Sequence, residues 1–165
     1  KVRLDADARL GADVGDALAS VIDCAIAALC AETFGVLDRI LKATIEYSRA
    51  RKQFGTPIGS FQALQHRMAD MLIQFEQARS MMYLATERCS DTDAGARRAS
   101  ISGAKALIGQ AARFIGQQAV QLHGGMGMTD ELDVSHCFKR LLAFELRMGT
   151  TDEHLEIYRR GLQAE

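Results

Sequence analysis

One proline in 165 residues, Pro57, constrains the fold more than any other feature of this sequence. Proline breaks the interior of an α-helix, so the long stretches on either side of Pro57 are free to be helical. Apolar residues recur at three- and four-residue spacing through most of these stretches, as they do on one face of a helix. Aromatic residues make up only 6% and Trp is absent, while Ala and Met are frequent. The sequence therefore predicts an all-α protein.

The first predicted helix begins at Asp16, a suitable N-cap residue, and ends near Arg49. At 1.5 Å per residue it would be about 50 Å long. Residues 17–36 are apolar nearly all round, so we expect this half to be buried on most sides. Before the helix, residues 2–10 alternate roughly between apolar and polar, which predicts a short extended arm.

Turn residues divide the rest of the chain into further helices. Residues 54–60 form the clearest loop, and Ser60 can cap a helix over residues 61–88. A third helix over residues 94–122 ends at the pair Gly124-Gly125, which suits positive backbone dihedrals. The fourth begins at Thr129 or Asp130, and a last helical segment begins near Thr151. The apolar positions of the second helix are Leu64, Met68, Met71, Phe75, Ala78 and Met82. Those of the third helix are Ile101, Ala104, Ile108, Ala111, Ile115, Ala119 and Leu122. Those of the fourth helix are Val134, Cys137, Phe138, Leu141 and Leu142. Long amphipathic helices with short connections predict an antiparallel four-helix bundle.

Charge and composition argue against several classes of partner. A net charge of −1 gives no reason to expect nucleic acid or an anionic membrane. We find no signal peptide and no apolar run that we judge long enough to span a bilayer. The cysteines show no zinc-like spacing, so we expect buried free thiols in a reducing compartment, the cytoplasm. They are Cys24, Cys30, Cys89 and Cys137.

Two motifs each allow two interpretations. Residues 49–55 place Arg49, Arg51 and Lys52 at the end of a long helix, where cations complement the helix dipole. Alternatively they form a phosphate clamp, for which the forked guanidinium of Arg51 is best suited. Residues 121–127, QLHGGMG, are either a glycine C-cap or a cradle of free amides for a phosphate or a flat cofactor.

Other polar residues indicate no catalytic set. The four histidines share no metal-ligand spacing, so we expect surface or packing roles for them. The first-turn acids Asp130, Glu131 and Asp133 are explained by the dipole of the predicted fourth helix. Among the later acids, none has a neighbour that would raise its pKa and make it a general base. These later acids are Glu145, Asp152, Glu153 and Glu156.

Taken together, the motifs resemble the acyl-CoA dehydrogenase family. Residues 51–58 (RKQFGTPI), 61–65 (FQALQ), 68–71 (MADM) and 121–140 occur in the family's order and spacing. The resemblance covers only the C-terminal helical domain of that family. It implies a bundle that forms the core of homodimers or dimers of dimers, with residues 16–165 as this domain and residues 1–15 as the tail of an absent middle β-domain.

The resemblance also implies FAD bound between subunits. Its implied contacts are Arg51, Gln53, Phe54 and Gln62 around the RxxFG motif, Gln121, Gly124 and Gly125 in the QxHGG segment, and Thr150. The cation and the free amides are groups that a diphosphate needs. An acyl-CoA substrate and an electron-transfer flavoprotein as acceptor follow from the family.

The family's catalytic base is missing from the sequence. The family usually takes a glutamate from a segment that here reads Arg147-Met148-Gly149-Thr150, and Met148 cannot accept a proton. A minority branch uses a glutamate from the first long helix, where this chain has Cys24-Ala25-Ile26. The altered segment is similar to the small subunits of heteromeric dehydrogenases of the pimeloyl-CoA type, whose partner supplies the base. Two alternatives are a homomeric enzyme with Glu145 or Asp152 as a displaced base, and a non-enzymatic oligomerisation module.

Overall fold

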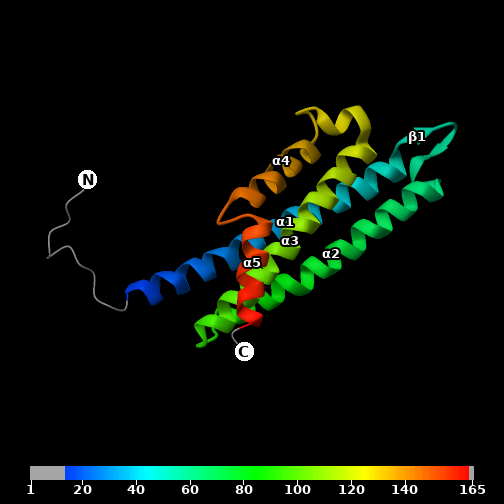
Figure 1. The fold of residues 1–165 in the computed structure, drawn as a ribbon. Coiled ribbons are helices and arrows are strands. Elements are labelled where there is room, and N and C mark those ends of the chain that lie inside the picture. The colour runs from blue at the N-terminus through cyan, green and yellow to red at the C-terminus, as the bar shows by residue number, and fades with distance from the viewer. Residues whose placement is uncertain (1–13, 164–165) are drawn as a thin grey trace.

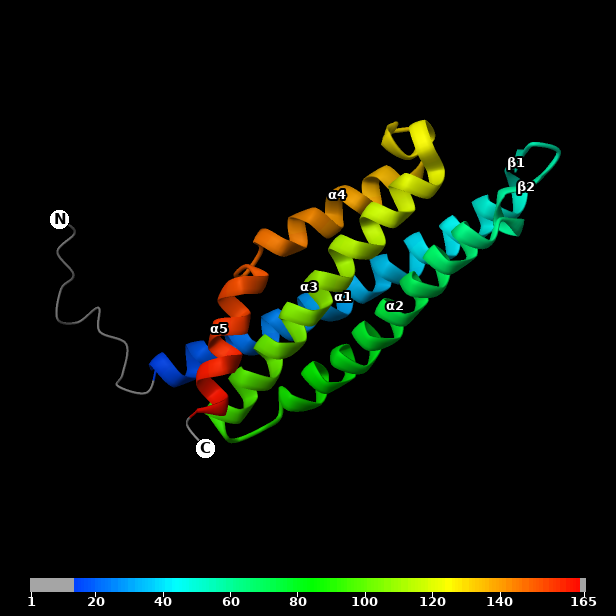
Figure 2. The ribbon, with the colours of Figure 1, turned by 45° about the vertical axis from the view of Figure 1, so that its right-hand side comes forward.

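The computed structural model describes residues 14–163 and confirms the all-α fold (Figure 1). Four long helices pack side by side with neighbours in sequence running antiparallel, and α5 packs across α3 (Figures 1 and 2). The extended arm predicted for residues 2–10 lies outside the described residues. The elements are α1 (Val14–Ala50), β1 (Lys52–Gln53), β2 (Thr56–Pro57), the 3-10 helix η2 (Ile58–Ser60), α2 (Gln62–Arg88), α3 (Ala94–His123), the 3-10 helix η3 (Gly124–Met128), α4 (Asp133–Leu146) and α5 (Thr151–Leu162).

Three of the predicted helix starts are wrong in detail. Asp16 lies inside the first turn of α1 and is not its cap. Phe61 precedes α2, because the Ser60 hydroxyl turns back and donates to the Pro57 carbonyl at 2.7 Å. Neither Thr129 nor Asp130 caps α4, since η3 continues the turn after α3 and delays the next helix until Asp133. The other starts have side-chain caps: Asp93 accepts from two amides of α3, and Thr150 forms a capping box with Glu153.

Helix α3 is the centre of the core. Every position of its predicted apolar stripe is buried, from Ile101 to Leu122. Alanines at 104, 111 and 119 leave room for close approach, and larger side chains of α1 and α2 such as Leu37, Met71 and Phe75 pack in the same cluster. On α4, Leu141 is buried as expected, but Leu142 is 45% exposed because it points away from the bundle.

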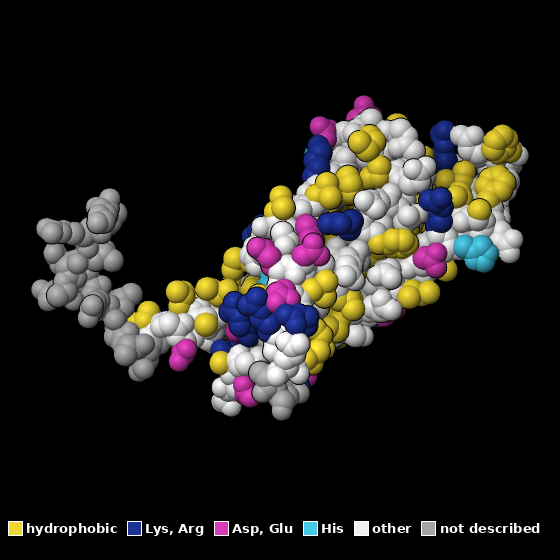
Figure 3. Space-filling model, viewed as in Figure 1, with side chains coloured by type: hydrophobic (Ala, Val, Ile, Leu, Met, Phe, Trp, Pro, Cys, Tyr) yellow, Lys and Arg dark blue, Asp and Glu magenta, His cyan; other side chains and the backbone are white. Residues whose placement is uncertain are grey.

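The expectation that residues 17–36 are buried on most sides is wrong for the described chain. Leu18 and Val21 are 56% and 65% exposed, and burial in α1 begins at Asp23. Figure 3 shows apolar side chains along this part of α1, which extends beyond the other helices. A contiguous apolar surface in water is typical of a contact surface.

The expectation about membrane spans also needs correction. Among the described residues, α1 is long and apolar enough to cross a bilayer by length and composition. A core helix of a soluble bundle passes the same test. Here Asp23, in the apolar half of α1, is 2% exposed and its carboxylate accepts from the Arg97 guanidinium of α3 at 3.1 Å. That buried ion pair and the contacts with α2, α3 and α4 indicate a bundle helix.

All four cysteines are free, but only Cys30 is buried, so the expectation of buried thiols holds for one of them. The other three are half-buried. His66 and His136 are exposed, whereas His123 and His154 are packed in the interior, as surface and packing roles predict. The described residues contain no cluster of His, Cys, Asp or Glu that could hold a metal ion.

Candidate functional site

The hairpin between α1 and α2 presents three of the predicted site residues to solvent. Arg51, Gln53 and Phe54 are all exposed, Phe54 to 92%. Phe54 and Gly55 form its two-residue turn with φ values of 54° and 81°. A left-handed, exposed phenylalanine is unfavourable, and such strain commonly marks a site kept for function. The Phe54 ring meets that of Phe61 edge to face, with centroids 6.3 Å apart.

The glycine segment lies at the same end of the bundle. Helix α3 ends at Gly124, whose φ of 60° and ψ of −140° favour glycine, while Gly125 keeps a negative φ, so only one glycine of the predicted pair needs its special freedom. The His123 ring stacks on Tyr47 of α1 with centroids 4.3 Å apart. Because α1 ends three residues after Tyr47, this stack places the glycine segment beside the hairpin. A cavity of about 460 Å³ lies between the two helix ends, lined in part by Glu46, Tyr47 and His123.

The remaining predicted residues of this end are exposed as well. Gln62 begins α2, and Gln121 lies in the last turn of α3. The side chains around Gly124 and Gly125 leave space: a Cβ added at either glycine would meet nothing within 4 Å. The structure therefore brings seven predicted residues, Arg51, Gln53, Phe54, Gln62, Gln121, Gly124 and Gly125, to one end of the bundle.

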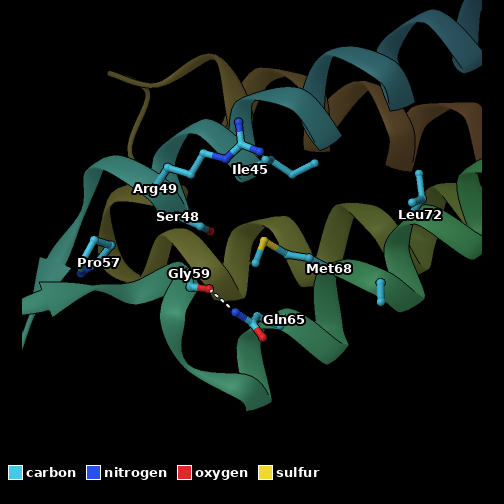
Figure 4. Close-up of a pocket in the computed structure, with 9 residues that line it drawn as sticks. Ile45, Ser48, Arg49, Pro57, Gly59, Gln65, Met68 and Leu72 are labelled. Carbon is cyan, nitrogen blue, oxygen red and sulfur yellow. Dashed lines mark hydrogen bonds between the residues drawn. The ribbon is translucent and has the colours of Figure 1, made fainter.

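A separate groove of about 470 Å³ runs between α1 and α2 next to the hairpin (Figure 4). Its lining is mainly apolar, with Ile45, Met68 and Leu72, and Arg49 extends over it from α1. The amide of Gln65 closes one wall by donating to the Gly59 carbonyl at 2.9 Å. The two arginines of the predicted clamp thus differ, since Arg49 lines this groove and Arg51 does not.

Met148 lies at the junction of α4 and α5, away from the hairpin. Its φ is 60° and that of Gly149 is 105°, so the chain reverses sharply here. The carbonyl of Met148 is 2.9 Å from His154 Nε2, and that of Gly149 accepts from Lys105 Nζ at 3.0 Å. The Met148 side chain, 47% exposed, lines a cavity of about 630 Å³ together with Ile22 and Ile26 of α1.

Lys105 holds this junction and was missed from the sequence. It is fully buried, and its ammonium also donates to the Phe144 carbonyl at 3.0 Å. The same ammonium lies 3.9 Å from the centre of the Phe144 aromatic ring. Burial lowers its pKa, although the charges of Cys30 and Glu145 act in the opposite direction. A signal was present, because Lys105 falls four residues after Ile101 and three before Ile108, on the buried face of the third helix.

Three carboxylates near Met148, those of Glu145, Glu153 and Glu156, are held by hydrogen bonds from other groups. Partial burial acts to raise the pKa of Glu145, but hydrogen bonds from the amide and hydroxyl of Thr151, with the charge of Arg113, outweigh it and keep that pKa below its ordinary value. Glu153 accepts from the amide and hydroxyl of Thr150, which lowers the pKa of Glu153. The pKa of Glu156, on the same cavity, is lowered to about 2 by hydrogen bonds from two arginines of α5, Arg159 and Arg160.

Comparison of the amino-acid sequence with known proteins identifies the family to which this helical domain belongs. Residues 20–163 match the family "Acyl-CoA dehydrogenase, C-terminal domain". The chain belongs to this family. Acyl-CoA dehydrogenase IpdE2 of Mycolicibacterium smegmatis is 38% identical over 156 residues, 94% of this chain and 45% of the relative.

Solved structures show the same domain. The ChsE4-ChsE5 complex from Mycobacterium tuberculosis matches with a TM-score of 0.82 and 29% identity, over 98% of this chain and 43% of that one. PigA, solved with FAD and proline, matches with a TM-score of 0.76 and 36% identity, over 86% and 37% of the two chains. The chain thus spans less than half the length of these relatives.

The family resemblance of the sequence implies that the catalytic base would lie at position 148, where this chain has Met148. The pKa values of Glu145, Glu153 and Glu156 are held below their ordinary values, so none of these three carboxyls is poised as a replacement base. The hydroxyl of Thr150 is engaged in the capping box of α5, 3.3 Å from the Glu153 amide. Its predicted contact with a cofactor stays a prediction.

Replacing Gly124 by alanine is expected to destabilise the domain by about 1–3 kcal/mol, because its backbone region is strained for any residue with a Cβ. Gly125→Ala is the matched control, since a Cβ there has open space and φ is not positive. We expect it to change stability by less than about 0.5 kcal/mol. Urea unfolding followed by circular dichroism measures both. Equal losses in the two variants would show that backbone strain at Gly124 is not the cause.

Proposed function

We propose that the chain is the C-terminal domain of an FAD-dependent acyl-CoA dehydrogenase subunit whose catalytic base comes from a second, homologous subunit. The observation that carries the proposal is Met148, a side chain without a proton-accepting group at the position where the family is expected to place its glutamate. The FAD-dependent relatives support the flavin, and the ChsE4-ChsE5 complex supports an assembly of two different chains.

The two groups of predicted cofactor residues fit a flavin shared between subunits. Ile26, which lines the same cavity as Met148, is on α1. Ala50, at the hairpin, is 24 residues further along the same helix. At 1.5 Å per residue this is about 36 Å along the helix, longer than an extended dinucleotide. One FAD therefore cannot reach from Met148 and Thr150 to Arg51 of the same chain. We infer that each end serves a different flavin, and that a partner chain completes each site.

In this arrangement the chain's own residues bind and orient. The guanidinium of Arg51 and the backbone at Gly124 and Gly125, where no Cβ obstructs a ligand, would hold the diphosphate, for which a forked cation is suited. The Gly124 amide itself already donates to the Gln121 carbonyl. The exposed Phe54 ring offers an apolar surface to the same cofactor. When bound, the flavin would take up hydride from the thioester's β-carbon. The α-proton needs a base, and Met148 cannot be that base.

Co-expression of the full-length subunit with a homologue that carries glutamate at the corresponding position tests the proposal. We expect the complex to bind FAD and to lose its flavin absorbance on anaerobic addition of acyl-CoA. The subunit alone should be about 100- to 10,000-fold slower, the usual contribution of a positioned base. A partner with glutamine in place of that glutamate is the control. Full turnover by the subunit alone, or by the complex with the glutamine partner, would refute the proposal.

A further inference from the structure

Two cysteines that lie 65 residues apart in the sequence meet at one end of the bundle. Cys24 is on α1, and Cys89 follows the last residue of α2. The Cys24 thiol donates to the backbone carbonyl of Cys89 at 3.8 Å. Both residues are half-buried, so a small molecule can reach them.

The other two cysteines do not combine partial exposure with a hydrogen bond to a second cysteine. Cys30 has no exposed surface, and burial raises the pKa of its thiol to about 12. Cys137 is half-buried on α4, where Arg39 and Asp133 are its charged neighbours. Neither makes a hydrogen bond to another cysteine within the described residues. The chain therefore contains one candidate thiol pair and two internal controls.

We propose that Cys24 and Cys89 form a reversible intrachain disulfide in exchange with a small-molecule disulfide such as glutathione disulfide. The thiolate of one cysteine attacks the reagent, forms a mixed disulfide and releases one glutathione thiolate. The second cysteine then attacks the protein sulfur of that mixed disulfide, forms the Cys24–Cys89 bond and releases the second glutathione. The two protein thiols lose two electrons and two protons, and one glutathione disulfide becomes two glutathione thiols.

The backbone around Cys89 leaves its side chain free to make the movement that the bond needs. Its thiol donates to the Ala85 carbonyl at 3.4 Å, within the last turn of α2, and this weak hydrogen bond has to break. Cys89 is the C-cap of α2 and leads into the turn before α3, so its backbone is not held on both sides by a helix. Cys24 is fixed in α1, and its thiol already lies against the backbone carbonyl of Cys89.

Burial, together with the charges around the pair, makes the exchange slow at neutral pH. Burial, the hydrogen bond with Cys24 and the charge of Asp23 raise the pKa of Cys89 to about 11, and Arg97 of α3 lowers it only in part. Because the thiolate is the nucleophile, the step in which Cys89 attacks should accelerate about tenfold for each pH unit between pH 7 and 9. The bond thus acts as a slow lock between α1 and α2 and not as a rapid sensor.

Closing a loop of this length restricts the unfolded chain, so the oxidised protein should melt roughly 5–15 °C above the reduced protein. The direct test incubates the full chain with glutathione disulfide at pH 8 and maps the peptides by mass spectrometry. We expect a linked peptide pair containing Cys24 and Cys89, which dithiothreitol separates. Cys24→Ser and Cys89→Ser should abolish this pair, whereas Cys137→Ser should retain it.

Three outcomes would overturn the proposal. The first is a chain whose Cys24 and Cys89 carry only glutathione after prolonged exposure at pH 8 and 9. The second is a linked pair that involves Cys30 or Cys137 in place of Cys89. The third is an oxidised chain with the melting temperature of the reduced one. None of these readouts depends on flavin or acyl-CoA, so the result is independent of the proposed function.

Discussion

Replacing Met148 by glutamate in the full-length subunit is expected to raise its unaided rate of acyl-CoA dehydrogenation by about 100- to 10,000-fold. The backbone at this position is already fixed, since the carbonyls of Met148 and Gly149 are held by His154 and Lys105. The side chain lines the 630 Å³ cavity and is half exposed, so a carboxylate of similar length can be accommodated there. The measurement is kcat/KM with an acyl-CoA series and an artificial electron acceptor.

Met148→Gln is the matched control, because glutamine has the same shape as glutamate and cannot act as a base. We expect it to leave the unaided rate at the level of the parent. Asp152→Asn, at the rim of the same cavity, tests whether a displaced carboxylate serves instead. If that change removed a substantial unaided rate of the parent, the enzyme would be homomeric and position 148 would not decide its activity.

The sequence predicted the helices and their order well, since apolar periodicity and turn residues depend on neighbours in the chain. Ile101 to Leu122 were expected on one buried face of the third helix, and all of that stripe is buried. Helix starts were less predictable. Ser60 and Thr129 are suitable caps by residue type, but each uses its hydroxyl in a local turn instead. Residue type alone does not reveal that competition.

The candidate site was predictable only as residues and not as an arrangement. The RxxFG and QxHGG segments were identified, yet their proximity depends on Tyr47 stacking on His123, a contact across 76 positions. The exposure of Leu18 and Val21 was not predictable either, because apolar periodicity shows which face seeks burial and not what covers it. Lys105 was missed for a related reason. A lysine on an apolar helix face breaks the expected pattern, and the sequence does not show which carbonyls would accept its hydrogen bonds in the interior.

Replacing Lys105 by methionine is expected to lower the free energy of unfolding by about 2–4 kcal/mol, because the carbonyls of Phe144 and Gly149 would lose a charged donor in the interior. Methionine keeps most of the length and apolar volume, so a cavity contributes little. Lys42→Met is the matched control on the surface, where the ammonium pairs with Asp38 at 2.7 Å and its side chain is 69% exposed. We expect that control to change stability by less than about 0.5 kcal/mol.

The free energy of unfolding of the parent and of Lys105→Met should differ by an amount that depends on pH. This pH dependence distinguishes the contribution of the buried charge from that of the two hydrogen bonds. Because burial lowers the pKa of Lys105, the unfolded chain binds more protons than the folded chain between that lowered pKa and the ordinary 10.5. The parent should therefore gain stability relative to Lys105→Met as pH rises through this window. Urea titrations of both proteins from pH 7 to 10 measure the difference. A variant as stable as the parent at every pH would show that the cost of burying the ammonium cancels its two hydrogen bonds, and that the Met148 junction is held by the capping box of α5 and by His154 instead.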